Sequence, residues 1–207
     1  MNPKLITELD TVPIVSLETC WAHLRITPED DSPPHHPDDE LILAYLAAAR
    51  EWVEGYTGVA LTPRKLELAL DTFPAGEIFL PTPPTVSVES VKYTDGDGVV
   101  QTVDPLNYVL DGYQRPGWLL PATGFSWPAT KDTVNAVLIR YFVGYALWDE
   151  SLPLSYYPLP KMLRSALLLL LGDLYENREN SSNQSQQEVP LGVKSLCDWV
   201  RVRKGMA

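Results

Sequence analysis

Residues 38–58, DDELILAYLAAAREWVEGYTG, predict an amphipathic helix. Their apolar side chains recur at intervals of three and four, which is the spacing of one buried helix face. Asp38 is expected to cap the first turn, where acidic side chains complement the helix dipole. Gly58 is expected to end the helix, because glycine readily adopts the left-handed conformation found at helix ends.

The pattern changes to the period of a β-strand from Arg64 onward. Leu66, Leu68 and Leu70 alternate with other residues, as the side chains of a strand alternate between its two faces. The sequence TDGDG at 94–98 predicts a hairpin turn, since Asp-Gly pairs supply the positive φ angles of tight turns. The middle of the chain therefore predicts an antiparallel region of roughly six strands.

A second strongly helical stretch follows Pro160, over residues 162–177. It contains five consecutive leucines, Leu167 to Leu171, which point in every direction around a helix axis. Such a helix is either buried on all sides within its own domain or covered partly by neighbouring subunits. The sequence leaves both interpretations open.

The order of these segments predicts an α+β fold: a small helical bundle, or helical hairpin, with an inserted antiparallel β region and a C-terminal arm. A polar stretch, SSNQSQQ at 181–187, predicts a mobile loop before that arm. The expected boundaries are 1–62 for the N-terminal helices, 63–157 for the β region, 158–188 for the main C-terminal helix and loop, and 189–207 for the arm.

The charge of the chain argues against a protein that grips nucleic acid. Sixteen Lys and Arg residues stand against 27 Asp and Glu residues, a net charge of −11. Phosphate backbones are bound by clustered basic residues, so a DNA-binding packaging protein such as a small terminase subunit is disfavoured. No membrane association is expected either, because apolar runs such as Ala166 to Leu171 are far shorter than the ~20 residues that span a bilayer.

No pattern in the sequence indicates catalysis, and neither a cofactor nor a metal is expected. The chain has no nucleophile elbow and no glycine-rich phosphate loop. Hairpin chemistry explains Asp95 and Asp97, and the adjacent His35 and His36 in a proline-rich loop are poorly placed to share one ion. Cys20 and Cys197 are far apart in the chain and form no zinc motif.

The C-terminal segment combines an aromatic residue with three cations on an otherwise acidic protein. Trp199 is followed by Arg201, Arg203 and Lys204. Trp and Arg are enriched among the residues that dominate protein interfaces. The segment is interpreted either as a docking arm or as a frayed tail.

Four segments together resemble the phage head-tail connector (head-completion adaptor) family, in the variant with a β insertion between its main helices. They are the helix at 38–58, IFLPTPPTVSVESVKYTDGDG at 78–98, LLLLLGDLYENRE at 167–179 and VPLGV at 189–193. The resemblance covers roughly residues 16–200. The chain differs from the family pattern in the long SPPHHP loop and in the segment at 146–159.

This resemblance implies a structural virion protein without enzymatic activity, made in the bacterial host cytoplasm and located in the neck between capsid and tail. It implies a homo-oligomeric ring of twelve copies bound to the portal protein. A tail-side stopper or tail terminator protein would bind the other side of the ring. Double-stranded DNA would pass through the ring without specific binding, which suits the acidic composition.

Two sets of residues are predicted to make contacts in such a ring. The portal-docking arm is expected to use Leu191, Val193, Leu196, Trp199, Arg201, Arg203 and Lys204. The subunit interface is expected to use Tyr45, Arg50, Trp52, Tyr56, Leu168, Leu171, Tyr175 and Arg178. Deleting residues 191–207 is expected to abolish portal binding and to leave the fold intact.

The alternative is a tail or baseplate protein whose β region binds a sugar or another tail protein. Ten tyrosines and six tryptophans keep this alternative open, since aromatic rings serve sugar binding as well as cores. A module of that kind would bind its ligand as a monomer and without a portal.

Overall fold

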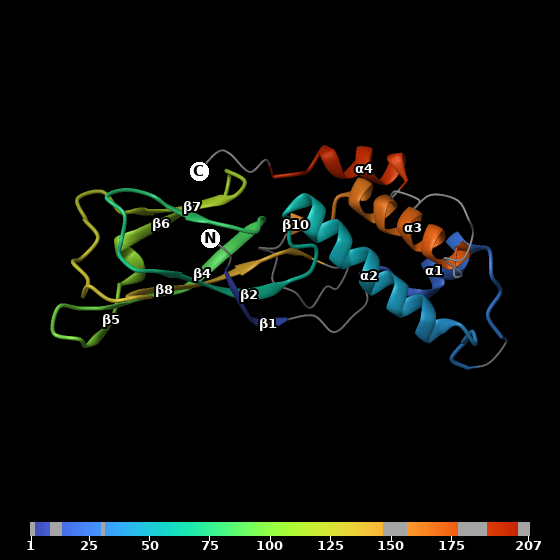
Figure 1. Cartoon of the computed structure of the whole chain (residues 1–207), viewed down its shortest axis with the longest axis horizontal. Coiled ribbons are helices and arrows are strands. Elements are labelled where there is room, and N and C mark those ends of the chain that lie inside the picture. The colour runs from blue at the N-terminus through green and yellow to red at the C-terminus, as the bar shows by residue number, and fades with distance from the viewer. Residues whose placement is uncertain (1–2, 9–13, 30–31, 147–156, 178–189, 203–207) are drawn as a thin grey trace. The chain divides into compact units, whose positions relative to one another are not determined.

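The chain consists of two compact units (Figure 1). The helical unit comprises residues 12–61 and 159–201, and the β unit comprises residues 1–11, 62–158 and 202–207. Helices in one unit and largely antiparallel sheets in the other confirm the predicted α+β class. The computed structural model describes residues 3–8, 14–29, 32–146, 157–177 and 190–202.

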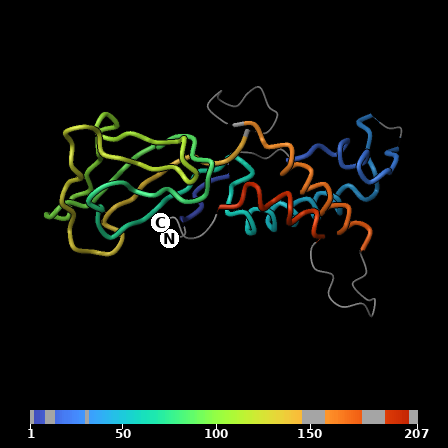
Figure 2. Tube along the Cα trace, turned by 90° about the horizontal axis from the view of Figure 1, so that it is seen from above, coloured from blue at the N-terminus to red at the C-terminus, as the bar shows by residue number. Residues whose placement is uncertain are grey.

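The helical unit is built on α2 and α3, with two short helices packed against them. The described helices are α1 (Leu17–Leu24), α2 (Asp39–Thr57), α3 (Lys161–Glu176) and α4 (Leu191–Asp198). In Figure 2, α2, α3 and α4 (cyan, orange and red) lie alongside one another. The buried side of α2 is formed by the apolar residues that the period predicted, namely Ile42, Leu46, Ala49 and Val53.

The ends of α2 are held in different ways. Gly58 has φ 72°, and its N–H donates to the Glu54 carbonyl, as predicted for a terminating glycine. Asp38 occupies the N-cap position, but its side chain makes no capping bond. Its carboxylate instead accepts a 2.6 Å hydrogen bond from the Tyr175 hydroxyl, so the predicted capping role is wrong. This bond joins the start of α2 to the last turn of α3.

The leucine-rich helix α3 is buried on one side only within its unit. Leu163, Ala166, Leu167, Leu170 and Leu171 are buried. Leu169 remains 44% exposed and Leu168 is half-buried. The interpretation in which the chain itself buries this helix on all sides is therefore wrong.

Residues 191–198 form a helix that belongs to the core of the helical unit. Val193 and Cys197 of α4 are buried, and α4 packs on α3. Deleting residues 191–207 would remove these core side chains, so the expectation that the fold survives the deletion is corrected. Single substitutions on the exposed side of α4 are the appropriate test of docking.

The β unit contains a five-stranded sheet, a three-stranded sheet and a short parallel pair. The order of neighbouring strands is β1-β2-β8-β4-β5 in the first sheet, β3-β7-β6 in the second and β10-β9 in the pair. The strands are β1 (Lys4–Glu8), β2 (Arg64–Leu70), β3 (Ile78–Leu80), β4 (Thr85–Thr94), β5 (Val100–Thr102), β6 (Tyr108–Asp111), β7 (Gly117–Pro121), β8 (Val137–Val143), β9 (Tyr145–Ala146) and β10 (Tyr157–Pro158), with a short 3-10 helix at Pro105–Asn107. Strand β1 was not predicted from the sequence.

The hairpin between β4 and β5 has the predicted turn. The Asp95 carboxylate accepts hydrogen bonds from the N–H groups of Asp97 at 3.1 Å and Val99 at 2.9 Å. Gly98 has φ 86°, which the tight turn requires. The amide of Gln101 also donates to this carboxylate and is the main cause that lowers the pKa of Asp95.

The core of the β unit lies between the inner faces of its two larger sheets. Alternate residues of β2 and β8 are buried, among them Leu68 and Ile139. Tyr141 of β8 is completely buried, and its hydroxyl donates to the Pro81 carbonyl at 3.0 Å. Pro81 directly follows β3, so this bond links the two sheets.

Replacing Tyr141 with phenylalanine is expected to destabilise the protein by about 1–2 kcal/mol. The ring still fills its site, but the Pro81 carbonyl loses its donor inside the core. Urea unfolding followed by tryptophan fluorescence measures the change. Tyr93→Phe, at a half-buried position where the hydroxyl makes no hydrogen bond to the described residues, serves as the control. Equal midpoints for the two variants would contradict the role of the Tyr141 bond.

Candidate docking surface

The described residues offer no arrangement typical of a metal site. Within them, no group of three or more His, Cys, Asp or Glu side chains could hold a metal ion. The ring of His36 accepts a hydrogen bond from the Asp38 N–H at 3.1 Å, and His35 lies 3.6 Å from Glu29, so both take part in loop contacts. None of the described helices is long and apolar enough to cross a membrane.

The outer side of α4 presents two large apolar residues to solvent. Leu191, Ser195 and Trp199 follow one another at intervals of four residues and face away from the buried Val193 and Cys197. Leu191 is 78% exposed and Trp199 is 82% exposed. We call Leu191, Ser195 and Trp199 the α4 face.

A polar and aromatic cluster holds the end of α4 against α2. The Tyr56 hydroxyl donates to the Asp198 carboxylate at 2.8 Å, and this bond is the main cause that raises the pKa of Tyr56. The Arg201 guanidinium lies 4.5 Å from the centre of the Tyr56 ring and 3.9 Å from the Asp198 carboxylate. Trp52 stacks on Tyr56 with ring centres 5.0 Å apart. The cluster fixes the backbone on both sides of Trp199.

The structure thus brings together members of the two residue sets that the sequence predicted. Trp52 and Tyr56 come from the predicted subunit interface, and Arg201 comes from the predicted docking arm. Asp198, which joins them, was missed because its partner Tyr56 lies 142 residues away. No local pattern in the sequence indicates such a pairing.

The remaining predicted contact residues differ in exposure. Half-buried positions are Tyr45, Arg50, Leu168, Tyr175 and Leu196. Val193 and Leu171 are completely buried in the helical unit and cannot contact a partner in this conformation. Arg178, Arg203 and Lys204 lie outside the described residues.

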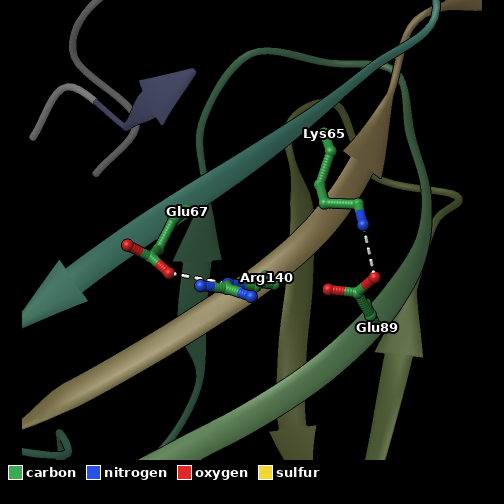
Figure 3. Close-up of polar contacts among 4 residues, drawn as sticks. All are labelled: Lys65, Glu67, Glu89 and Arg140. Carbon is green, nitrogen blue, oxygen red and sulfur yellow. Dashed lines mark hydrogen bonds and ion pairs between the residues drawn. The ribbon is translucent and has the colours of Figure 1, made fainter. Parts of the chain in front are cut away.

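The outer face of the five-stranded sheet carries two ion pairs (Figure 3). Glu67 of β2 lies directly across from Arg140 of β8, and their side chains meet at 2.7 Å. Lys65 reaches Glu89 at 2.5 Å, where β4 has an irregular register between Val88 and Ser90. The opposite charges on this face pair with each other across the strands, and such pairs stabilise a sheet.

Cys20 and Cys197 are both buried in the helical unit, and burial raises the pKa of each thiol to about 11. The thiolate is the reactive form, so neither residue is expected to react with Ellman's reagent at pH 8 in the folded protein. Both are expected to react once urea unfolds the chain. Rapid reaction of a native thiol would contradict the described packing.

The same shifts predict the direction of a pH effect on stability. Both thiols have folded-state pKa values above the ordinary value of 9.0, so the neutral thiol is favoured by folding. Their contribution to stability is complete below pH 9.0 and is lost as the pH rises towards about 11. Replacing both residues with alanine should flatten this part of the stability profile in urea unfolding experiments. An unchanged slope would contradict the assignment to the thiols.

Comparison with known proteins gives matches among solved structures only. No protein-family model matches the chain, and no curated protein matches it. A chain in a structure described as the neck of an empty gene transfer agent (GTA) particle, computed with C6 symmetry, is 26% identical with a TM-score of 0.72. That match covers 98% of this chain and 97% of the other. The present chain is similar to it from end to end.

Two further structures of the same kind of particle agree with this match. A chain in the virion of a native GTA particle is 26% identical, with a TM-score of 0.69 and 95% coverage of each chain. A chain in the neck of a native GTA particle, computed with C12 symmetry, is 25% identical with a TM-score of 0.61. It covers 98% of this chain and 97% of the other. The similarity therefore includes both the helical unit and the β unit.

Proposed function

We propose that this protein is a structural component of the neck of a phage-like particle. The observation that carries the proposal is the end-to-end similarity to a GTA neck chain, at 26% identity and a TM-score of 0.72. Coverage of 97% of that chain means that no large part of it lacks a counterpart here.

Within the neck, the proposed role is that of a head-tail adaptor. Copies of the chain form a ring under the portal protein, extend the DNA channel and offer a platform to a tail-side stopper or terminator protein. The symmetries of the similar neck structures, C6 and C12, support a ring and favour twelve copies. The net charge of −11 supports a channel through which DNA slides without being held.

The α4 face is the proposed contact with the portal. Exposed Trp and Leu side chains on a fixed helix supply the apolar anchor of an interface. Arg201 stands beside them in the described structure, and Arg203 and Lys204 follow in the sequence. These cations give the site a charge opposite to that of the chain as a whole, which favours a partner with an acidic rim.

The sugar-binding alternative gains no support from the aromatic residues of the β unit. Phe73 stacks on Trp127 with ring centres 4.9 Å apart, and Phe79 packs edge-on against Trp118. The Trp127 indole N–H donates to the Gly76 carbonyl at 2.8 Å. These rings pack against one another: Phe73 lies in the core, and Phe79, Trp118 and Trp127 are half-buried.

Cryo-electron microscopy of purified particles from cells that produce this chain tests the neck location. The proposal predicts density between capsid and tail that both units of the chain fit. Particles that are complete with tails but lack the chain, as judged by mass spectrometry, would contradict the proposal.

A further inference from the structure

The outer side of α2 is acidic and has short side chains. Glu40, Ala44, Ala48, Glu51 and Gly55 are exposed and lie opposite the buried residues of the same helix. Ala47 lies beside them and is also exposed. We call these six residues the α2 face.

The outer side of α3 has the complementary character. Lys161, Ser165 and Leu169 are exposed and follow one another at intervals of four residues. Leu169 presents 44% of its surface to solvent, although it lies in the middle of a run of leucines. We call Lys161, Ser165 and Leu169 the α3 face.

The two faces are different surfaces of the helical unit. Helices α2 and α3 pack on each other, and each outer face lies opposite the buried residues of its own helix. Two different faces on one unit suit head-to-tail contacts, which close into a ring when the rotation from one copy to the next closes. A two-fold dimer would instead need one face that is complementary to itself.

We propose that the α3 face of one copy packs on the α2 face of the next copy in the ring. This inference rests on the proposed neck function and adds to it the surfaces through which the copies associate. The bulky Leu169 meets the short side chains of Ala44 and Ala47, which let the helix backbones approach closely. Lys161 meets Glu51 at the other end of the contact.

The spacing of these residues fits a single register. Tyr175 at the end of α3 bonds to Asp38 at the start of α2, so the two helices run antiparallel in the chain. We take α3 of one copy and α2 of the next to run antiparallel as well. The distance from Lys161 to Leu169, about 12 Å along α3, then matches the distance from Glu51 to Ala44, about 10 Å along α2.

Cysteine cross-linking in assembled particles tests the contact. The variant Ala44→Cys/Leu169→Cys replaces the natural chain, and particles are oxidised before denaturing electrophoresis without reducing agent. The expected result is a ladder of covalent multimers up to the full ring. The native Cys20 and Cys197 are buried and are not expected to contribute.

The control variant Ala44→Cys/Thr123→Cys moves the second thiol to an exposed position of the β unit. A ladder of equal strength from this control would overturn the pairing of faces, as would neck-located chains that stay uncross-linked in the first variant. Particles without the chain in their necks would instead count against the proposed function, so the two failures are distinguishable.

A charge exchange gives a second test that needs no cysteine. Lys161→Glu and Glu51→Lys should each weaken association by about fivefold per contact, because each places like charges together. The double variant Lys161→Glu/Glu51→Lys restores opposite charges and should recover the amount of chain per particle. A double variant that incorporates no better than the single ones would overturn the inferred register.

Discussion

Replacing Trp199 with alanine is expected to weaken binding to the portal ring by roughly 30-fold or more. Trp199 on the α4 face is 82% exposed, so the folded chain loses almost no packing when the ring is removed. The melting temperature should therefore stay unchanged while affinity falls. Titration of immobilised portal rings with the purified chain measures the first quantity, and calorimetry measures the second.

The control for this experiment is another exposed apolar residue of similar accessibility. Leu106 of the β unit is 85% exposed, and Leu106→Ala should leave portal affinity unchanged. Leu191→Ala, on the α4 face, should reduce affinity by a smaller factor than Trp199→Ala, because less apolar surface is lost. Equal affinities for Trp199→Ala and the natural chain would remove α4 from the docking surface.

Replacing Gly144 with alanine is expected to cost at least ~3 kcal/mol of folding free energy. Gly144 has φ 111°, a region that residues with a side chain rarely adopt. A Cβ atom at this position would also lie 2.2 Å from the Thr62 carbonyl oxygen, so the backbone around β8 and β9 would have to shift. Urea unfolding should show a large fall in the midpoint or no folded protein.

Gly76 provides the matched control. A Cβ atom added there meets nothing within 4 Å, and its φ is not in the left-handed region. Gly76→Ala is expected to leave stability unchanged or to raise it slightly, because alanine restricts the unfolded chain. A Gly144→Ala variant as stable as Gly76→Ala would contradict the described backbone conformation.

The local elements of the fold could be predicted because local rules determine them. The interval of three and four residues identified the buried side of α2, and Gly58 marked its end. The TDGDG turn identified the β4–β5 hairpin. The α+β class followed from the order of these patterns.

Long-range pairings could not be predicted from the same patterns. Strand β1 has a mostly exposed burial pattern, so no alternation marks it as a strand, and its pairing with β2 decides its structure. The bond between Asp38 and Tyr175 replaces the local capping bond that the sequence favoured. Tertiary contacts overrode local propensity at both positions.

The candidate docking surface was predictable in part. The composition of the C-terminal segment indicated Trp199 and Arg201, and both lie at the exposed end of α4. The sequence did not show that Val193 and Cys197 point into the core, because an eight-residue helix has too few turns to fix its buried side by period alone. The exposure of Leu169 also depends on how α1, α2 and α4 surround α3.

Native mass spectrometry of the purified chain mixed with portal rings from the same particle tests the adaptor role most directly. The adaptor role predicts a complex heavier than the portal ring by the mass of about twelve chains of 23.1 kDa. A portal ring whose mass stays unchanged at every mixing ratio would contradict it.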